Sequence, residues 1–300
     1  MFSKKAENKR KEAISFYEND YKRGNHFRGN SYSEKRNNCK LEAQRKAVAA
    51  FPKLNVEENE SYERYYFVPN NELVFLYFHA GGFTAGAKET GRLFLAPYLK
   101  KMSAEGISFD YPYAPENSIE TILKTSFEFY KKIAQLSYKR FVLCGSSSGA
   151  MIVLSLIQYA KRENIRLPDA VVISSPIVIL GEKDSNSCLK EHDIILRSYD
   201  SDKILKLSET PADKKDVFFD LLNGDYSSFP VTYISTGSEE RLLDDSVKLF
   251  EKIKKENKST RSCLSVYPGM WHGFLGEDLV ESREEQKRVI AFLNKVLYES

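Results

Sequence analysis

Residues 141–150 read FVLCGSSSGA, and the rest of the predicted fold is arranged around this stretch. Its first four residues are apolar, as in a buried strand, and two glycines then bracket three serines in the pattern G-x-S-x-G. The segment that follows, residues 150–163, has helical length and spacing. A strand, a tight turn and a helix in this order are typical of a nucleophile elbow, which would present the Ser147 hydroxyl above a sheet. The alternative is a small-residue turn without chemistry.

The same alternation of strand and helix continues on both sides of this stretch. Other apolar runs that are too short for a helix lie at residues 73–78, 107–110, 170–174, 231–235 and 263–266. Segments of helical length lie at residues 88–103, 118–135, 244–256 and 278–298. Strands that alternate with helices predict an α/β fold with a mostly parallel central sheet and helices on both faces.

Residues 181–229 interrupt this alternation. They are polar and charged, with helix-like parts around residues 189–207 and 212–223. Because they separate two strands that should be neighbours, we interpret them as an insertion. Insertions at the carboxyl end of such a sheet commonly lie over the ligand crevice.

Composition excludes several classes of protein. The chain has 300 residues, 42% of them hydrophobic, and a formal net charge of +3, which favours a globular protein and does not indicate a nucleic-acid partner. The first 50 residues are basic, which indicates a solvated helix surface or, alternatively, contact with a membrane surface or polyanion. No apolar run approaches the roughly 20 residues of a membrane span.

The start of the chain and the cysteines bear on location. The charged first residues have no apolar stretch behind them, which predicts that there is no signal peptide. The four cysteines show no paired spacing, so we expect reduced thiols, no zinc site and a cytoplasmic location.

A serine nucleophile needs a base. Of the four histidines only His272 lies in a loop after the last predicted strand, between glycines at 269 and 273. In α/β-hydrolases the chain order is serine, acid, histidine, and His272 satisfies it. Its neutral imidazole would take the proton from Ser147, so activity is expected to fall below about pH 6.5.

The acid should lie in the loop after the predicted strand at 231–235. That loop holds four carboxylates: Glu239, Glu240, Asp244 and Asp245. Chain order alone does not choose among them. The others would be charges near a helix N-terminus, where the helix dipole favours them.

Backbone donors for an oxyanion are expected directly after the strand at 73–78. There, Gly81 and Gly82 leave room for N–H groups to approach a ligand oxygen. The N–H of Ser148, the residue after the nucleophile, would complete the oxyanion hole. His79 is then expected to brace this loop and not to act as a base.

Four segments together resemble the hormone-sensitive-lipase-like family of α/β-hydrolase esterases. HAGGF at 79–83 is similar to H-G-G-G-[FW], and DYPYAPE at 110–116 is similar to D-Y-R-L-A-P-E. GSSSG at 145–149 resembles G-[DT]-S-A-G, and YPGMWHGF at 267–274 resembles Y-P-G-M-x-H-x-F. The resemblance runs from about residue 75 to the C-terminus.

The resemblance implies an α/β-hydrolase domain at residues 61–300 with a helical cap. The cap would combine an N-terminal helical segment, residues 1–60, with the insertion at 181–229. ERLLDD at 240–245 is similar to the family segment D-x-L-x-D-[DE], which places the acid at Glu240, with Glu239 and Asp244 still open. A homodimer is possible by the same resemblance.

These patterns together predict a serine carboxylesterase for short-chain acyl esters. The triad would be Ser147, His272 and Glu240, working through an acyl-enzyme without metal or cofactor. Alanine at position 80 and serine at 148 depart from the family pattern and leave the acyl preference open. Two alternatives stay open as well: a non-catalytic small-molecule binder on the same fold, and an amidase or peptidase with the same triad; thioester cleavage is a further possibility.

Overall fold

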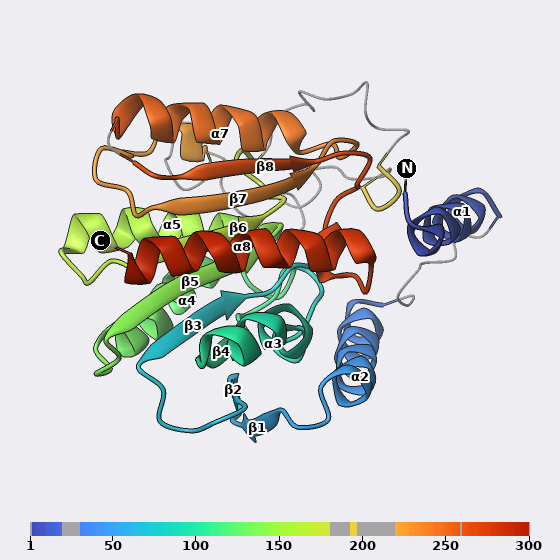
Figure 1. The fold of residues 1–300 in the computed structure, drawn as a ribbon, viewed down its shortest axis with the longest axis horizontal. Coiled ribbons are helices and arrows are strands. Elements are labelled where there is room, and N and C mark those ends of the chain that lie inside the picture. Colours follow the sequence, from blue (N-terminus) through green and yellow to red (C-terminus); the bar gives the residue numbers. More distant parts are fainter. Residues whose placement is uncertain (1, 20–30, 181–192, 197–219, 259, 300) are drawn as a thin grey trace.

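The computed structural model describes residues 2–19, 31–180, 193–196, 220–258 and 260–299 (Figure 1). The first part of the chain forms α1(Lys4–Asn19), α2(Tyr32–Ala50), β1(Asn55–Glu58), β2(Tyr62–Tyr66), β3(Leu73–Phe78), α3(Thr90–Met102), β4(Glu105–Phe109) and α4(Ile119–Ala134). The second part forms β5(Arg140–Ser146), α5(Ser148–Glu163), β6(Ala170–Ser174), η3(Leu221–Asn223), β7(Thr232–Gly237), α7(Leu243–Glu256), β8(Cys263–Tyr267), η4(Phe274–Gly276) and α8(Val280–Tyr298).

These strands form one eight-stranded sheet in the order β1-β2-β4-β3-β5-β6-β7-β8. The six strands from β4 to β8 in this order pair in parallel, while β1 and β2 add an antiparallel edge. Because neighbouring parallel strands end on the same side, the loops after β3, β5, β6, β7 and β8 meet at one edge of the sheet. The predicted α/β fold is confirmed.

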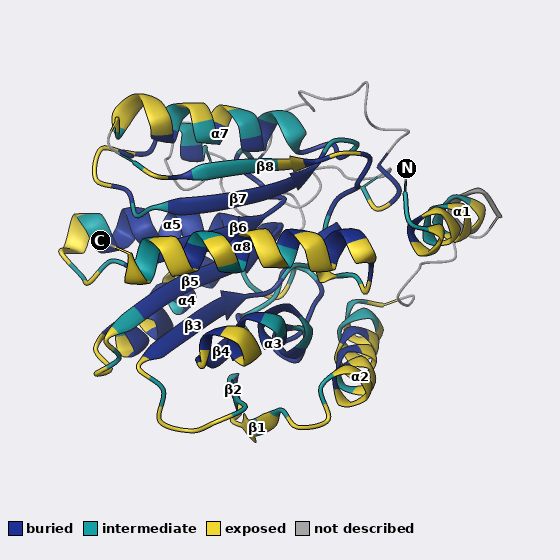
Figure 2. Ribbon diagram, viewed as in Figure 1, coloured by how far each residue is buried: buried dark blue, intermediate teal, exposed yellow. Residues whose placement is uncertain are grey.

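Both faces of the sheet are covered by helices. Along β3, alternate residues belong to two different clusters: Val74, Leu76 and Phe78 pack with α4 and α5, whereas Phe75 and Tyr77 pack with α3 and α8. In Figure 1, α8 and α3 lie in front of the sheet, with α4 and α5 behind it. Figure 2 shows that the central strands are buried along their length, while α8 exposes the side that faces the viewer.

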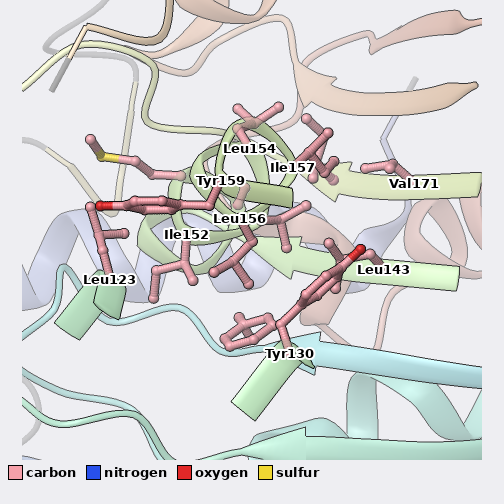
Figure 3. Close-up of a cluster of buried hydrophobic side chains, with 14 of the residues drawn as sticks. Leu123, Tyr130, Leu143, Ile152, Leu154, Leu156, Ile157, Tyr159 and Val171 are labelled. Carbon is pink, nitrogen blue, oxygen red and sulfur yellow. The ribbon is translucent and has the colours of Figure 1, made fainter. Parts of the chain in front are cut away.

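The helix after the elbow is held on every side. From Ser148 to Ala160, each residue of α5 is buried. Figure 3 shows apolar side chains of α5 in one cluster with Tyr130 of α4 and the strand residues Leu143 and Val171. This packing fixes the N-terminus of α5 relative to β5, and so fixes the turn between them.

Six predicted strands are present, two of them, 73–78 and 170–174, with the predicted bounds. The edge strands β1 and β2 were not expected, because their sequences NVEE and YERYY show no apolar run. In β2 a charged residue, Glu63, takes a buried position and pairs with Arg92 of α3.

Two findings bear on the predicted domain boundaries. β1 lies before residue 60, so the sheet begins inside the segment assigned to the N-terminal helical part. Most of the predicted insertion, residues 181–192 and 197–219, lies outside the described residues. Within the described part of the chain, no helix is both long and apolar enough to cross a membrane.

Candidate active site

Ser147 stands alone at the turn between β5 and α5. Its backbone has φ 54° and ψ −120°, a conformation that residues other than glycine rarely adopt. Its N–H donates to the carbonyl of Ser174 at 2.9 Å. The flanking glycines are required by close contacts. A Cβ at position 149 would lie 2.0 Å from the carbonyl oxygen of Phe78, and one at 145 would lie 2.4 Å from that of Gly149. The turn therefore has the strained geometry that the sequence motif predicts.

His272 reaches this serine from the loop after β8. Its Nε2 lies 3.0 Å from Ser147 Oγ, and both side chains are buried. Burial lowers the pKa of His272, and the negative charge of Asp193 offsets part of this effect. The imidazole is consequently held in its neutral form, which can accept the serine proton.

Glu240 is the carboxylate that lies beside this histidine. Its Oε2 is 4.0 Å from His272 Nδ1, and the side chain is fully buried. Glu239 pairs with Arg10 of α1, and Asp244 lies in the first turn of α7.

The Glu240 carboxylate is held by hydroxyl groups. Ser175 Oγ donates to Oε2 at 2.7 Å, and Thr236 Oγ1 donates to Oε1. Burial raises the pKa of Glu240 to about 8; the two hydroxyls and the Gly237 N–H act against this rise, and Asp193 adds to it. Removing any of these donors would favour the protonated form further.

The loop after β3 holds the two glycines that the sequence predicts as oxyanion donors. Gly81 and Gly82 have φ 138° and 59°. The Gly81 carbonyl accepts the N–H groups of Thr84 and Ala85, which closes a tight turn, and a Cβ at position 81 would lie 1.9 Å from the Ala85 carbonyl oxygen. Only glycine fits there. The third predicted donor, the N–H of Ser148, belongs to the first residue of α5, directly after Ser147.

His79 braces this loop, as expected from the sequence. Its buried ring stacks on Tyr111 with centroids 4.1 Å apart, and its Nδ1 lies 2.9 Å from the Ala80 carbonyl. Nε2 lies 3.5 Å from Asp110 Oδ1. The His79 ring thus contacts its own loop and the two residues that follow β4, Asp110 and Tyr111.

Both N-terminal helices contact the loops of the site. On the side of α1, Arg10 pairs with Glu239, next to Glu240, and Lys9 pairs with Glu277, just beyond the histidine loop. Phe2 packs where a Cβ on Gly269 would be, 1.8 Å from a ring carbon. Helix α2 contacts the loop after β3, where Arg36 donates to the Thr84 carbonyl. These contacts support the proposal that residues 1–60 contribute to a cap.

Arg36 of α2 fastens the oxyanion loop. Its guanidinium donates to the carbonyls of Thr84 at 3.0 Å and Ala114 at 2.9 Å, and pairs in bidentate fashion with Glu116. It also lies over the Tyr113 ring, 4.4 Å from the centroid. No sequence pattern indicates this contact, because the partners are 48 to 80 residues away.

Replacing Arg36 with alanine is expected to lower kcat/KM by about tenfold or more, since a displacement of the loop misplaces the oxyanion donors. Arg36→Lys should recover little, because lysine lacks the planar fork. Steady-state kinetics with a melting curve checks this, with Lys46→Ala as the control. Lys46 lies on the same helix in an exposed pair with Glu42. Unchanged kinetics in Arg36→Ala would mean that the loop holds its shape without α2.

Two further residues near the proposed triad were not predicted from the sequence: Ser175 and Asp193. Ser175 directly follows β6, at the strand edge where ligands bind in such sheets, and that position was the available signal. Asp193 is buried, and its Oδ2 accepts the N–H of Arg241 at 3.0 Å. Among the residues that the structure describes, no group of three or more His, Cys, Asp or Glu could hold a metal ion.

Comparison with known proteins places this geometry in context. Residues 75–276 match the model of a family described as alpha/beta hydrolase fold. An esterase from Acinetobacter venetianus (strain RAG-1) is 28% identical over 216 residues, which are 68% of this chain and 67% of the relative. An acetyl-hydrolase from Streptomyces hygroscopicus is 24% identical over 200 residues, 66% of each chain. The alignments thus span about two thirds of these relatives.

Solved structures agree on the fold. A hormone-sensitive lipase from a metagenome library superimposes with a TM-score of 0.84 at 22% identity, over 97% of this chain and 98% of that one. An esterase from the bacterial hormone-sensitive lipase family gives a TM-score of 0.80 at 20% identity, over 97% and 98%.

Proposed function

The chain belongs to the alpha/beta hydrolase family whose model matches residues 75–276, and on that premise we propose that it is a serine carboxylesterase. Membership confirms the family resemblance inferred from the four motifs. The observation that carries the proposal is the 3.0 Å separation of Ser147 Oγ and His272 Nε2, with the serine at a strained strand–helix turn. This is the arrangement in which a neutral imidazole can activate a hydroxyl.

Acylation begins with attack of Ser147 Oγ on the ester carbonyl carbon. His272 Nε2 takes the hydroxyl proton as the Oγ–C bond forms, and the carbonyl oxygen becomes an oxyanion. The N–H groups of Gly81, Gly82 and Ser148 stabilise that oxyanion. When the intermediate collapses, the bond to the alcohol breaks and His272 returns the proton to the leaving oxygen.

Deacylation repeats these steps with water. His272 takes a proton from water as its oxygen attacks the acyl carbon, and then returns the proton to Ser147 Oγ as the acid leaves. Glu240 acts throughout by stabilising the imidazolium and orienting its ring. We expect the 4.0 Å gap between Glu240 Oε2 and His272 Nδ1 to shorten when the ring becomes charged.

We infer a short acyl group for the substrate. The relative from Streptomyces hygroscopicus is named an acetyl-hydrolase, and both N-terminal helices contact loops of the site, Arg10 through Glu239 and Arg36 through the Thr84 carbonyl. A non-catalytic binder would have no need of the contact between Ser147 and His272. An amidase or peptidase would use the same groups, so the leaving group must be tested directly. Dimerisation remains a prediction.

The proposal is tested with p-nitrophenyl esters of increasing acyl length, from acetate to laurate, beside the matching p-nitroanilides. We expect the highest kcat/KM at acetate to butyrate and much slower turnover of the anilides. An optimum at long chains would overturn the short-chain assignment, and faster cleavage of anilides would favour the amidase. If no substrate is turned over, labelling of Ser147 by a fluorophosphonate distinguishes a working nucleophile with another substrate from a binder.

A further inference from the structure

No hydrogen bond between the two side chains holds the proposed triad acid, Glu240, against His272. Glu240 comes from the loop after β7, and His272 comes from the loop after β8. Their carboxylate and ring approach only to 4.0 Å, which is beyond hydrogen-bond distance. His272 Nδ1 has no hydrogen-bond partner within the described part of the chain. Another group must therefore keep the carboxylate facing the ring.

Ser175 contacts both loops at once. Its Oγ donates to Glu240 Oε2 at 2.7 Å, on the same oxygen that faces His272, and accepts the N–H of Gly273 at 3.2 Å. Gly273 is the residue after His272. The Ser175 hydroxyl thus uses its proton on the acid and a lone pair on the histidine loop.

The backbone that carries this hydroxyl is strained. Its φ is 49°, in the left-handed region that glycine prefers, and its N–H donates to the Ser235 carbonyl at 2.8 Å. The side chain is completely buried. A non-glycine residue held in this conformation, with both hydrogen-bonding functions used at the site, points to a functional constraint.

We propose that Ser175 is a positioning residue of the triad, which joins the acid loop to the histidine loop through one hydroxyl. The proposal rests on the function proposed above. Thr236 donates to the other carboxylate oxygen, Oε1, and within the described part of the chain it makes no hydrogen bond to the histidine loop. Ser175 is accordingly the group that sets the separation between acid and base, while Thr236 sets the tilt of the carboxylate.

Two variants separate the hydroxyl from the strained backbone. Ser175→Ala removes the hydroxyl and keeps the strain, and Ser175→Gly removes both. Ser235→Ala is the matched control, because Ser235 is equally buried on the neighbouring strand and its hydroxyl has no partner among the described residues. We expect both Ser175 variants to lose about ten- to hundredfold in kcat, with KM little changed, as for loss of hydrogen bonds to a charged group. The control should match the wild type.

The pH profile distinguishes positioning from folding. The groups that face Glu240 are His272 and Asp193, which are titratable, and the Ser175 and Thr236 hydroxyls with the Gly237 N–H. Removing the Ser175 donor destabilises the ionised carboxylate, so the acid limb of kcat/KM should move to higher pH by about half a unit or more. A purely structural defect would lower the melting temperature and leave the limb where it was.

The outcomes are separate for the two proposals. Loss of kcat in both variants, with the shifted limb, supports positioning by Ser175. Wild-type kinetics in both, or a loss without a shifted limb, overturns it while Ser147-dependent turnover still supports the esterase. If the wild type turns over no ester but a fluorophosphonate labels Ser147, the labelling rate and its pH profile replace turnover. If Ser147 is not labelled either, both proposals fail.

Discussion

Ser147→Ala is expected to lower kcat/KM on a short p-nitrophenyl ester by at least about 10⁴-fold, because no other group supplies the attacking oxygen. The protein should remain folded. Alanine has a Cβ like serine, so the strain at φ 54° is unchanged and the melting temperature should stay close to that of the wild type. Kinetics and a melting curve on the same preparation measure both quantities.

Ser146→Ala is the control for this variant, since the motif contains three serines in a row. Only the middle one has a positive φ and lies against His272. The control should keep activity within a few-fold, and a fluorophosphonate should label one peptide, at Ser147. A loss below tenfold in Ser147→Ala would show that another residue is the nucleophile.

Glu240→Gln is expected to have the second largest effect, a fall in kcat/KM of roughly 10²- to 10⁴-fold, because the imidazolium loses its counter-charge. In the wild type, kcat/KM should rise with pH through about 8. Burial lowers the pKa of His272 and raises that of Glu240 to about 8, so the last proton to leave the pair leaves Glu240. The limb then lies above the value near 6.5 that a histidine alone would give.

The same carboxylate links stability to pH. Its pKa is about 8 when folded, against an ordinary value of 4.5, so between these values the folded protein keeps a proton that the unfolded chain has released. The free energy of unfolding should therefore fall as pH rises from about 4.5 to 8, by an amount on the order of a few kcal/mol. Glu240→Gln lacks this fall and should melt higher than the wild type at pH 9, with no advantage near pH 4.

Glu239→Gln and Asp244→Asn are the matched controls, because both carboxylates were open candidates in the sequence and both lie away from His272. Each should keep its activity within a few-fold and show the wild-type pH limb. If Glu239→Gln loses activity as strongly as Glu240→Gln, the acid has been misassigned. If Glu240→Gln melts below the wild type at pH 9, the buried carboxylate does not carry the raised pKa.

Strands that are buried on both faces were predictable from the sequence. In β3 the six residues Leu73–Phe78 are all apolar and all buried, since helices cover both faces, and the predicted bounds were correct. β2 was not predicted, because its sequence YERYY is not a run of apolar residues. Its buried Glu63 is stabilised by Arg92, 29 residues later, so a charged residue marks a core-facing position.

For the site, the prediction was sharpest where the chemistry is local. The elbow needs glycines at fixed offsets from the serine, because a Cβ at 149 would meet the backbone at the end of β3 and a Cβ at 145 would meet the backbone of the turn itself. These steric requirements are visible in the sequence as glycines two positions before and after Ser147. The acid could be selected only by the family resemblance. Four carboxylates lie within seven residues, and the sequence does not show which of their side chains points toward His272.

Sequence patterns alone predicted the strand–turn–helix around Ser147, the glycine loop after β3 and an α/β fold of parallel strands, and they led to the proposed order of serine, acid and histidine. These features depend on residue size, hydrophobicity and spacing over short stretches. The tertiary structure decided which carboxylate faces His272, what Ser175 joins, and which loop Arg36 fastens. Those contacts join residues 32 to 98 positions apart. The contacts among Ser175, Glu240 and the histidine loop form because parallel strands bring their carboxyl ends to one edge, and the Arg36 contact forms because α2 packs beside the loop after β3.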